Sequence, residues 1–213
     1  MWFPSGWESS SPRRVIVGLH GTGGSGEEDW WFNWKDAVST KGWAYIGLTY
    51  VNGTGEHDDE PTAYANLKTA LDEMRTSCDF GTPSMFLVGF SRGSAMTFGV
   101  SYLDLKDRRF FKSFGENSGA WPAGTNPSAT VQGIADRSES AAYANGQFWM
   151  YCGERDFTHG SGMCDEMVTA QTFVTRYGGS VRELFRDPTG GHGGLASNAS
   201  ALSSMFAFFE SLR

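Results

Sequence analysis

The sequence predicts an α/β fold, in which a mostly parallel sheet of about six strands is covered by helices on both faces. Short runs of β-branched, aliphatic or aromatic residues alternate with amphipathic stretches from one end of the chain to the other. The strand-like runs are apolar on both faces, which is typical of parallel strands buried between two helical layers. The length of 213 residues fits a single domain over 1–213, because one core commonly reaches roughly 200 residues before a chain divides.

The predicted elements follow from the period of the apolar residues. Strands are predicted from short apolar runs over 14–19, 44–49, 85–90, 111–116, 147–152 and 181–185. Helices are predicted over 28–39, 62–77, 92–105, 164–177 and 195–212. The clearest helix is 62–77, in which one apolar stripe is formed by Ala63, Leu67, Ala70, Leu71 and Met74. The stretch 122–145 is rich in Ala, Gly, Ser and Asn and is predicted to be a loop with a short helix.

Composition and charge exclude several classes of protein. Hydrophobic residues make up 39% of the chain, which is enough for a buried core and excludes a disordered chain. The net charge of -7 argues against nucleic acid as a partner. No apolar run approaches the ~18 residues of a membrane span, so we expect a soluble protein. The three cysteines, Cys78, Cys152 and Cys164, are too scattered for a zinc site, so no metal is expected.

The first seven residues contain neither the basic region nor the apolar region of a signal peptide. The chain is therefore expected to be either intracellular or a secreted protein whose leader has been removed, and the secreted alternative is preferred.

A candidate nucleophile lies between a predicted strand and a predicted helix. The segment Gly89-Phe90-Ser91-Arg92-Gly93 has the G-x-S-x-G pattern of a nucleophile elbow, a strained turn that exposes a serine hydroxyl above the sheet. Glycines flank the serine because the turn leaves no room for Cβ atoms against the neighbouring strand and helix. The spacing alone is a weak signal, and its place directly after a buried strand makes Ser91 the candidate nucleophile.

A glycine-rich loop, 20–26, follows the first predicted strand. Such a loop can direct backbone N–H groups toward a tetrahedral oxyanion. A phosphate loop is the rival interpretation, but the segment lacks the Gly-Lys-Ser/Thr ending of that motif. The sequence favours the oxyanion interpretation.

Four histidines compete for the role of general base. His192 lies among glycines after the last predicted strand, where a ring can lean over the serine. His20 belongs to the glycine-rich loop and is expected to pack or hydrogen-bond locally. His57 lies in the acidic run 56–60, which is expected to be a solvated surface turn.

The acid that orients the base has one preferred candidate and three rivals. Asp156 follows the strand 147–152 by a short turn and gives the chain order Ser, Asp, His. Glu154 and Asp165 share its loop, and Glu116 ends the preceding strand. We prefer Asp156 on position alone.

These residues resemble the α/β-hydrolase superfamily, and more narrowly its esterases similar to polyhydroxybutyrate depolymerases and feruloyl esterases. The likeness covers 15–212 and rests on the segments His20-Gly21-Thr22-Gly23-Gly24 and Cys152-Gly153-Glu154-Arg155-Asp156, the elbow around Ser91 and the loop around His192. The resemblance implies a Ser91 nucleophile, a His192 base, an Asp156 orienting acid, and an oxyanion hole made by the backbone N–H groups of Thr22 and Arg92. The first two antiparallel strands common in the family are missing from the pattern, which leaves six strands.

Clues to the substrate are fewer. Trp121 is a candidate for lining the site, and the group Trp30, Trp31 and Trp34 is a weaker one, because most tryptophans belong to the core. No insertion is long enough for a substantial lid, so the site should be open to bulky or polymeric esters. Cys152 and Cys164 bracket the Asp156 loop and are either bridged or reduced, whereas Cys78 is expected to be free.

The sequence thus predicts a serine hydrolase that cleaves carboxylic esters through an acyl-enzyme and needs no cofactor. A thioesterase or lysophospholipase with the same residues is the alternative among enzymes. From another class, the alternative is an inactive hydrolase-fold protein that binds a ligand or partner.

Overall fold

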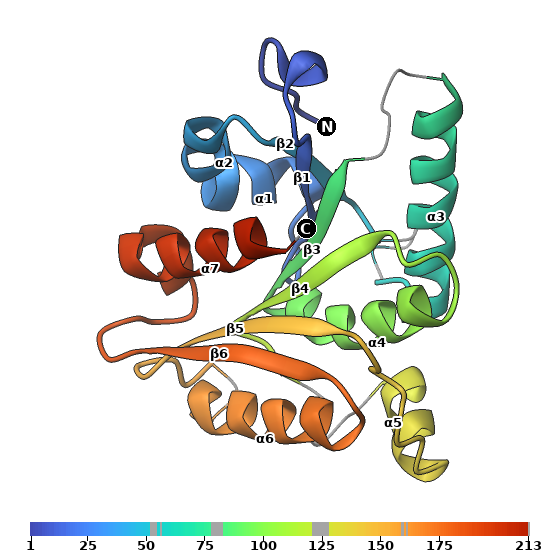
Figure 1. The fold of residues 1–213 in the computed structure, drawn as a ribbon. Helices are drawn as coiled ribbons and strands as arrows, with labels where there is room; N and C mark the ends of the chain where they lie inside the picture. The colour runs from blue at the N-terminus through green and yellow to red at the C-terminus, as the bar shows by residue number, and fades with distance from the viewer. Residues whose placement is uncertain are drawn as a thin grey trace.

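The computed structural model describes residues 1–51, 55, 57–77, 83–120, 128–158, 160 and 162–212 of the chain. Its centre is one sheet of six strands, all parallel, in the order β2-β1-β3-β4-β5-β6 (Figure 1). The strands are β1 Arg14–Leu19, β2 Ala44–Leu48, β3 Ser84–Phe90, β4 Phe111–Asn117, β5 Gln147–Gly153 and β6 Ser180–Asp187. Each predicted strand is present, and the predicted α/β class is confirmed.

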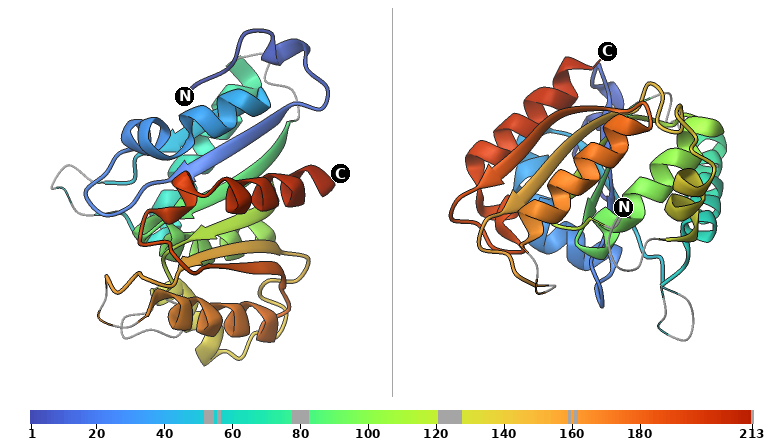
Figure 2. Two further views of the ribbon diagram at one scale, coloured as in Figure 1. Left: turned by 90° about the vertical axis from the view of Figure 1, so that its left-hand side faces the viewer. Right: turned by 90° about the horizontal axis from the view of Figure 1, so that it is seen from below.

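Helices cover both faces of the sheet (Figures 1 and 2). One face carries α1 Gly26–Asp29, α2 Lys35–Lys41 and α7 Ala199–Ser211, and the other carries α3 Glu60–Ser77, α4 Arg92–Lys106, α5 Ala129–Asp136 and α6 Met163–Arg176. The short helix predicted within 122–145 is α5. This layering places the carboxyl ends of all six strands, and the loops that follow them, at one edge of the sheet, where parallel α/β proteins build their sites.

Alternate residues of each strand point into two separate cores. In β1, Val15 and Val17 belong to the core under α3, α4 and α6, whereas Ile16 belongs to the core under α2 and α7. In β5, Met150 and Trp149 divide in the same way. Both faces of the sheet are therefore dry, which explains why the strands appear in the sequence as continuous apolar runs.

Two predicted helices are interrupted. The prediction of one helix over 195–212 is wrong, because a 3-10 turn, Gly194–Ser197, precedes α7 and the helix begins anew after Asn198. The Asn198 side chain accepts a hydrogen bond from the Ala201 backbone N–H and so caps α7. Its amide nitrogen also donates to Asp187, at the end of β6, which fixes the break in place.

The predicted helix 28–39 is likewise three pieces, with a π-helical turn, Trp30–Trp34, between α1 and α2. Asp29 spans this turn, since its carboxylate accepts hydrogen bonds from the side chains of Asn33 and Trp34. The spacing of apolar residues, from which the helix was predicted, does not reveal side-chain hydrogen bonds such as those of Asp29.

The N-terminus adds a contact that the sequence did not predict. Trp2 pairs with Tyr45 as an antiparallel bridge on the outer edge of β2, through two backbone hydrogen bonds of 2.8 and 2.9 Å. The Trp2 ring also stacks on Trp30 at 4.7 Å between centroids. The first residues therefore cover part of an edge that parallel sheets leave exposed.

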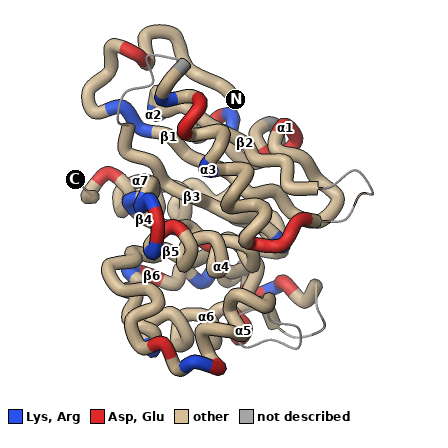
Figure 3. Tube along the Cα trace, turned by 90° about the vertical axis from the view of Figure 1, so that its right-hand side faces the viewer, with Lys and Arg blue, Asp and Glu red and all other residues tan. Residues whose placement is uncertain are grey.

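Charged residues are spread over the surface, with Lys and Arg interspersed among Asp and Glu along the trace in Figure 3. Among the described residues, no helix is both long and apolar enough to cross a membrane.

Candidate active site

Ser91 occupies a tight turn between β3 and α4. Its φ of 54° lies in a region that non-glycine residues rarely adopt, which is typical of a strained functional turn. A Cβ at Gly89 would lie 2.2 Å from the carbonyl oxygen of Gly93, and a Cβ at Gly93 would lie 2.0 Å from that of Leu19. Only glycine fits at either position, so both glycines of the motif are explained by close packing of β3, α4 and β1.

Three side chains from three different loops meet above this turn. His192 Nε2 lies 2.8 Å from Ser91 Oγ, and His192 Nδ1 lies 2.7 Å from Asp156 Oδ2. These contacts assign the tautomer in which Nδ1–H donates to the carboxylate and Nε2 accepts from the hydroxyl. The structure thus brings together the predicted nucleophile, base and acid in one hydrogen-bonded series.

Asp156 is suited to remain ionised in this position. The residue is 2% exposed, and burial by itself raises the pKa of its carboxyl. The hydrogen bonds that it accepts from Thr158 and His192 outweigh that effect and hold its pKa below the ordinary value. A buried carboxylate with this pKa carries its charge over the pH range in which His192 would need a counter-charge.

The rival acids are engaged elsewhere. Glu154 forms an ion pair with Arg186 at 2.7 Å, and Asp165 lies in the first turn of α6. Glu116 is fully buried beneath the elbow and accepts a hydrogen bond of 3.1 Å from Ser94 in the first turn of α4. Burial raises the pKa of Glu116 well above its usual value, which favours the neutral carboxyl over the carboxylate.

The loops that carry Asp156 and His192 are tied to each other. A Cβ at Gly153 would lie 2.3 Å from the carbonyl oxygen of Gly190, so only glycine permits the two loops to approach this closely. The backbone N–H of Arg155 donates to the same oxygen at 3.0 Å. The distance between the acid and the base is therefore set by backbone contact and does not depend on the side chains alone.

Asp187 is a site residue that the sequence analysis missed. It ends β6, is 4% exposed, and accepts hydrogen bonds from Tyr151, Thr189 and Asn198. The bond from Asn198 is the largest of the causes that lower its pKa to about 2. Asp187 thus anchors both ends of the loop that carries His192, and the Asp-Pro-Thr sequence at 187–189 was the available signal for this side-chain turn.

The glycine-rich loop lies beside the elbow. A Cβ at Gly21 would lie 3.3 Å from the Cβ of Ser91. The backbone just before Thr22 therefore passes close to the candidate nucleophile. Arg92, the other predicted oxyanion donor, is the first residue of α4. The N–H groups of a first helical turn point out of the helix end, toward the space above Ser91.

No protein-family model matches the sequence, and neither does any curated protein. Solved structures do match: an esterase from Rhizomucor miehei has a TM-score of 0.69 at 15% identity and covers 99% of this chain and 78% of its own. Esterase PE8 has a TM-score of 0.65 at 17% identity (96% and 95% covered), and a carboxylesterase from Mesorhizobium loti has 0.65 at 13% (96% and 91% covered).

The chain has the α/β-hydrolase fold. The resemblance stated from the sequence is thereby confirmed at the level of the fold. The first strand of the described sheet in chain order, β1, is the one followed by the glycine-rich loop.

The remaining histidines and tryptophans occupy different surroundings. His20 stacks on Tyr50 at 4.5 Å and donates from Nδ1 to the Gly21 carbonyl oxygen, as predicted for a locally packed residue. Within 57–60, the described part of the acidic run, the prediction of a solvated turn is wrong for His57, which is half-buried against Tyr50, and for Glu60, which is 2% exposed, whereas Asp59 is exposed. The reason is that α4 packs over this turn.

Trp34 is buried in the core and Trp30 packs on Tyr45, so these two rings serve the packing of the helical layer and do not line the site. Trp121, Cys78 and the side chain of Trp31 lie outside the described residues.

Cys152 and Cys164 form a disulfide with their Cα atoms 5.1 Å apart. The bridge joins the end of β5 to the start of α6 and closes the loop that carries Asp156. Within the part of the chain that the structure describes, no group of three His, Cys, Asp or Glu side chains is placed to hold a metal ion.

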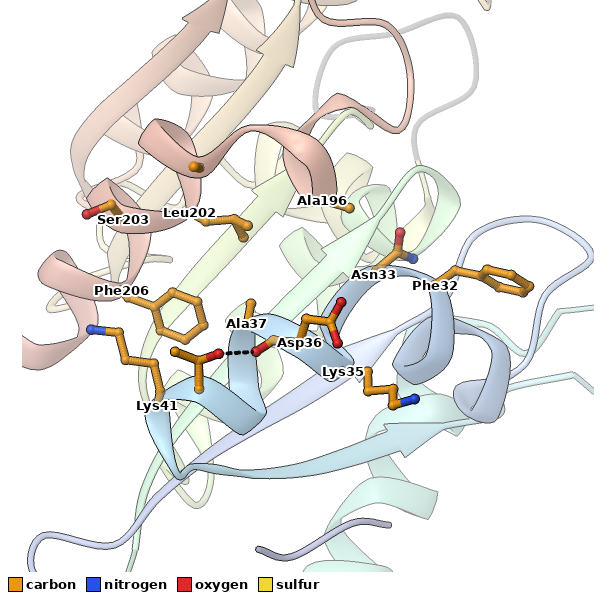
Figure 4. A pocket seen from close by; sticks show the side chains of 12 residues that line it. Phe32, Asn33, Lys35, Asp36, Ala37, Lys41, Ala196, Leu202, Ser203 and Phe206 are labelled. Carbon is orange, nitrogen blue, oxygen red and sulfur yellow. Dashed lines mark hydrogen bonds between the residues drawn. The ribbon is translucent and has the colours of Figure 1, made fainter.

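Three cavities bear on the candidate site and its surroundings. One of about 260 Å³ is bounded by the glycine-rich loop, Phe90 and Phe32. A second, of about 390 Å³, lies between α2 and α7, with Leu202 and Phe206 on one wall and Ala37 on the other (Figure 4). Phe32 and Asn33 border both cavities. A third, of about 320 Å³, lies beyond Arg92 on the α4 side.

Proposed function

We propose that the chain hydrolyses carboxylic esters through an acyl-enzyme formed on Ser91. The observation that carries the proposal is the series of hydrogen bonds from Ser91 Oγ through His192 to Asp156, at 2.8 and 2.7 Å. The α/β-hydrolase fold and the similarity to structures named as esterases support it.

In the proposed mechanism, Ser91 Oγ attacks the ester carbonyl carbon while His192 Nε2 takes its proton. The Asp156 carboxylate stabilises the imidazolium that forms and holds the ring in the required tautomer. The tetrahedral intermediate collapses when His192 donates the proton to the departing alkoxide. Water then attacks the acyl-enzyme by the same steps, with His192 as the base, and releases the carboxylic acid.

The oxyanion of both tetrahedral intermediates would be held by the backbone N–H groups of Thr22 and Arg92. Their places support this role, since the loop of Thr22 contacts Ser91 and Arg92 begins the helix that follows it. Fixed donors of this kind stabilise charge that develops only in the transition state, which is why they accelerate the reaction.

The substrate class within carboxylic esters is inferred from access to the site. The His192 side chain is 26% exposed, so the base is open to solvent. An open site suits bulky or polymeric esters such as feruloyl esters and polyesters, and the chain is proposed to act on these.

The test is an ester panel run with wild type and Ser91→Ala. We expect wild type to hydrolyse p-nitrophenyl esters, a feruloyl ester and a polyester film, and Ser91→Ala to lose at least about 10⁴-fold in kcat, because the nucleophile contributes the covalent step. A thioester in the same panel distinguishes an esterase from a thioesterase, because a thioesterase would hydrolyse it in preference to the esters. Turnover near the wild-type rate in folded Ser91→Ala would refute the mechanism.

A further inference from the structure

A polar cavity on the α4 side of Ser91 is left unused by the proposed mechanism. It has a volume of about 320 Å³ and is lined by 57–61 before and within α3, by Arg92 and Met96 of α4, and by 128–130 at the start of α5. These three segments follow the carboxyl ends of β2, β3 and β4, so the cavity lies at the same edge of the sheet as Ser91. Arg92, the residue that follows Ser91 in the chain, lies on the wall of this cavity.

The wall contains buried polar atoms without a hydrogen-bond partner among the described residues, and Glu60 Oε1 and His57 Nε2 are two of them. The other carboxyl oxygen of Glu60 accepts a long hydrogen bond of 3.4 Å from Thr130, and the side chain of Ser128 also interacts with the carboxyl. A buried polar atom without a partner destabilises the folded protein, because its hydrogen bond to water is lost and not replaced, so each such atom calls for a reason.

The Glu60 side chain, from the start of α3, packs against α4 at a position where α4 has a glycine. A Cβ at Gly99 would lie 2.4 Å from Glu60 Cγ, so any other residue there would displace the carboxyl. Gly99 lies inside α4, where glycine is less favourable than alanine because it loses more backbone freedom on folding. The helix therefore carries a glycine that makes room for a buried, incompletely bonded carboxyl at the cavity wall.

We propose that this cavity is a substrate subsite in which Glu60 and His57 recognise hydroxyl groups on one half of the ester. The inference rests on the proposed function and narrows its substrate to hydroxyl-bearing esters. A hydroxyl both donates and accepts, so it can satisfy a carboxyl oxygen and an imidazole nitrogen together.

Charged groups fit the cavity less well. Asp58 and Asp59 line it near the start of α3, but Asp59 already caps α3 by accepting from the Thr62 N–H, and Asp58 accepts from Asn66. Burial raises the pKa of Glu60, which disfavours the anion that a cationic ligand would require. An anionic ligand would meet the Arg92 guanidinium but would also face the carboxyls of Asp58 and Asp59 on the same wall.

The experiment compares kcat/KM within matched ester pairs. Inositol monoacetate against cyclohexyl acetate places the hydroxyls on the alcohol half, and p-nitrophenyl 6-hydroxyhexanoate against p-nitrophenyl hexanoate places one on the acyl half. Choline acetate against 3,3-dimethylbutyl acetate tests for a cation instead. We expect wild type to prefer the hydroxylated member of one pair by about tenfold or more, as one or two hydrogen bonds to buried groups provide.

Two variants and one control assign that preference to the cavity. Glu60→Met and His57→Phe should each bring the kcat/KM ratio of the preferred pair toward one. Glu73→Met, the same replacement at an exposed position of α3, should keep the wild-type ratio. If Glu60→Met does not fold, as judged by circular dichroism, His57→Phe carries the test.

Ester hydrolysis by wild type with a ratio near one for both hydroxylated pairs overturns this inference and leaves the proposed function standing. A preference for choline acetate that Glu60→Met removes also overturns it, because the subsite would then bind a cation. Absence of turnover on every ester overturns the proposed function and the inference with it.

Discussion

Asp156 differs from the other carboxylates of its loop in what it contacts, although the side chains are chemically alike. It is buried and bonded to His192, whereas Glu154 pairs with Arg186 at the surface. The contribution of a carboxylate to an imidazolium depends on contact and low dielectric, since a solvated charge acts only through screened Coulomb interactions.

We predict that Asp156→Asn lowers kcat by a factor on the order of 10⁴, the effect known for a serine protease triad, because an amide favours the wrong tautomer and leaves the imidazolium uncompensated. Glu154→Gln and Asp165→Asn are the matched controls and should each change kcat less than about threefold. Ester hydrolysis rates with a p-nitrophenyl substrate decide the matter. An active Asp156→Asn would place the orienting acid elsewhere.

Glu116 is a residue whose effect should be on stability. Its pKa is raised in the folded protein by burial, so the folded state holds the proton more tightly than the unfolded state. Stability from this group is present below the unfolded pKa near 4.5 and is lost as pH rises toward the folded value, by about 1.4 kcal/mol for each unit between the two values.

Glu116→Gln removes this titration and keeps an acceptor for Ser94. We predict that variant and wild type have similar unfolding free energies at pH 4, and that the variant is the more stable of the two at pH 8. Urea unfolding at both pH values measures the difference. An equal free-energy gap at the two pH values would show that Glu116 does not titrate as proposed.

At the scale of elements, the loop between β6 and α7 is held at both ends by Asp187. Tyr151 from β5 and Asn198 at the α7 cap both donate to its Oδ2, so three elements converge on one carboxylate. This arrangement positions His192 without touching it, in the way that outer residues orient ligands in other sites.

Asp187→Asn should lower kcat about 10- to 100-fold with a smaller change in KM, because the amide replaces an acceptor by a donor and releases the loop. Asp136→Asn, at an exposed position of α5, is the control. The lowered pKa of Asp187 adds a second readout. The unfolding free energy of wild type should fall by about 2 kcal/mol as pH falls from the unfolded pKa of 3.8 toward 2, and that of the variant should not. A variant with both wild-type kcat and wild-type acid stability would refute this role.

At the scale of the whole molecule, the bridge between Cys152 and Cys164 restricts the unfolded chain over a separation of 12 residues. Closing a loop of this size stabilises the folded state by about 3 kcal/mol in the entropy model, which corresponds to roughly 6 to 12 °C in Tm for a chain of this length. We predict that reductant lowers Tm by this amount in wild type and leaves the Cys152→Ala/Cys164→Ala variant unchanged. Three titratable thiols in the native wild type would show that the bridge is absent.

The sequence by itself determined the order of strands and helices, because strands buried on both faces must be continuous apolar runs and the amphipathic helices must alternate with them. It also located the turn at Ser91, since two close backbone approaches admit only Gly89 and Gly93. Such local requirements leave a direct trace in residue type.

Only the tertiary structure decided which carboxylate faces His192, where the last helix begins, and that Glu60 is buried. Glu154, Asp156 and Asp165 offer the same chemistry within one loop, and the choice among them depends on the contact between Gly153 and Gly190. The break at Asn198 depends on Asp187, and the burial of Glu60 depends on the space left by Gly99. Each of these outcomes is set by contacts between segments distant in the chain, so no window of the sequence contains the information.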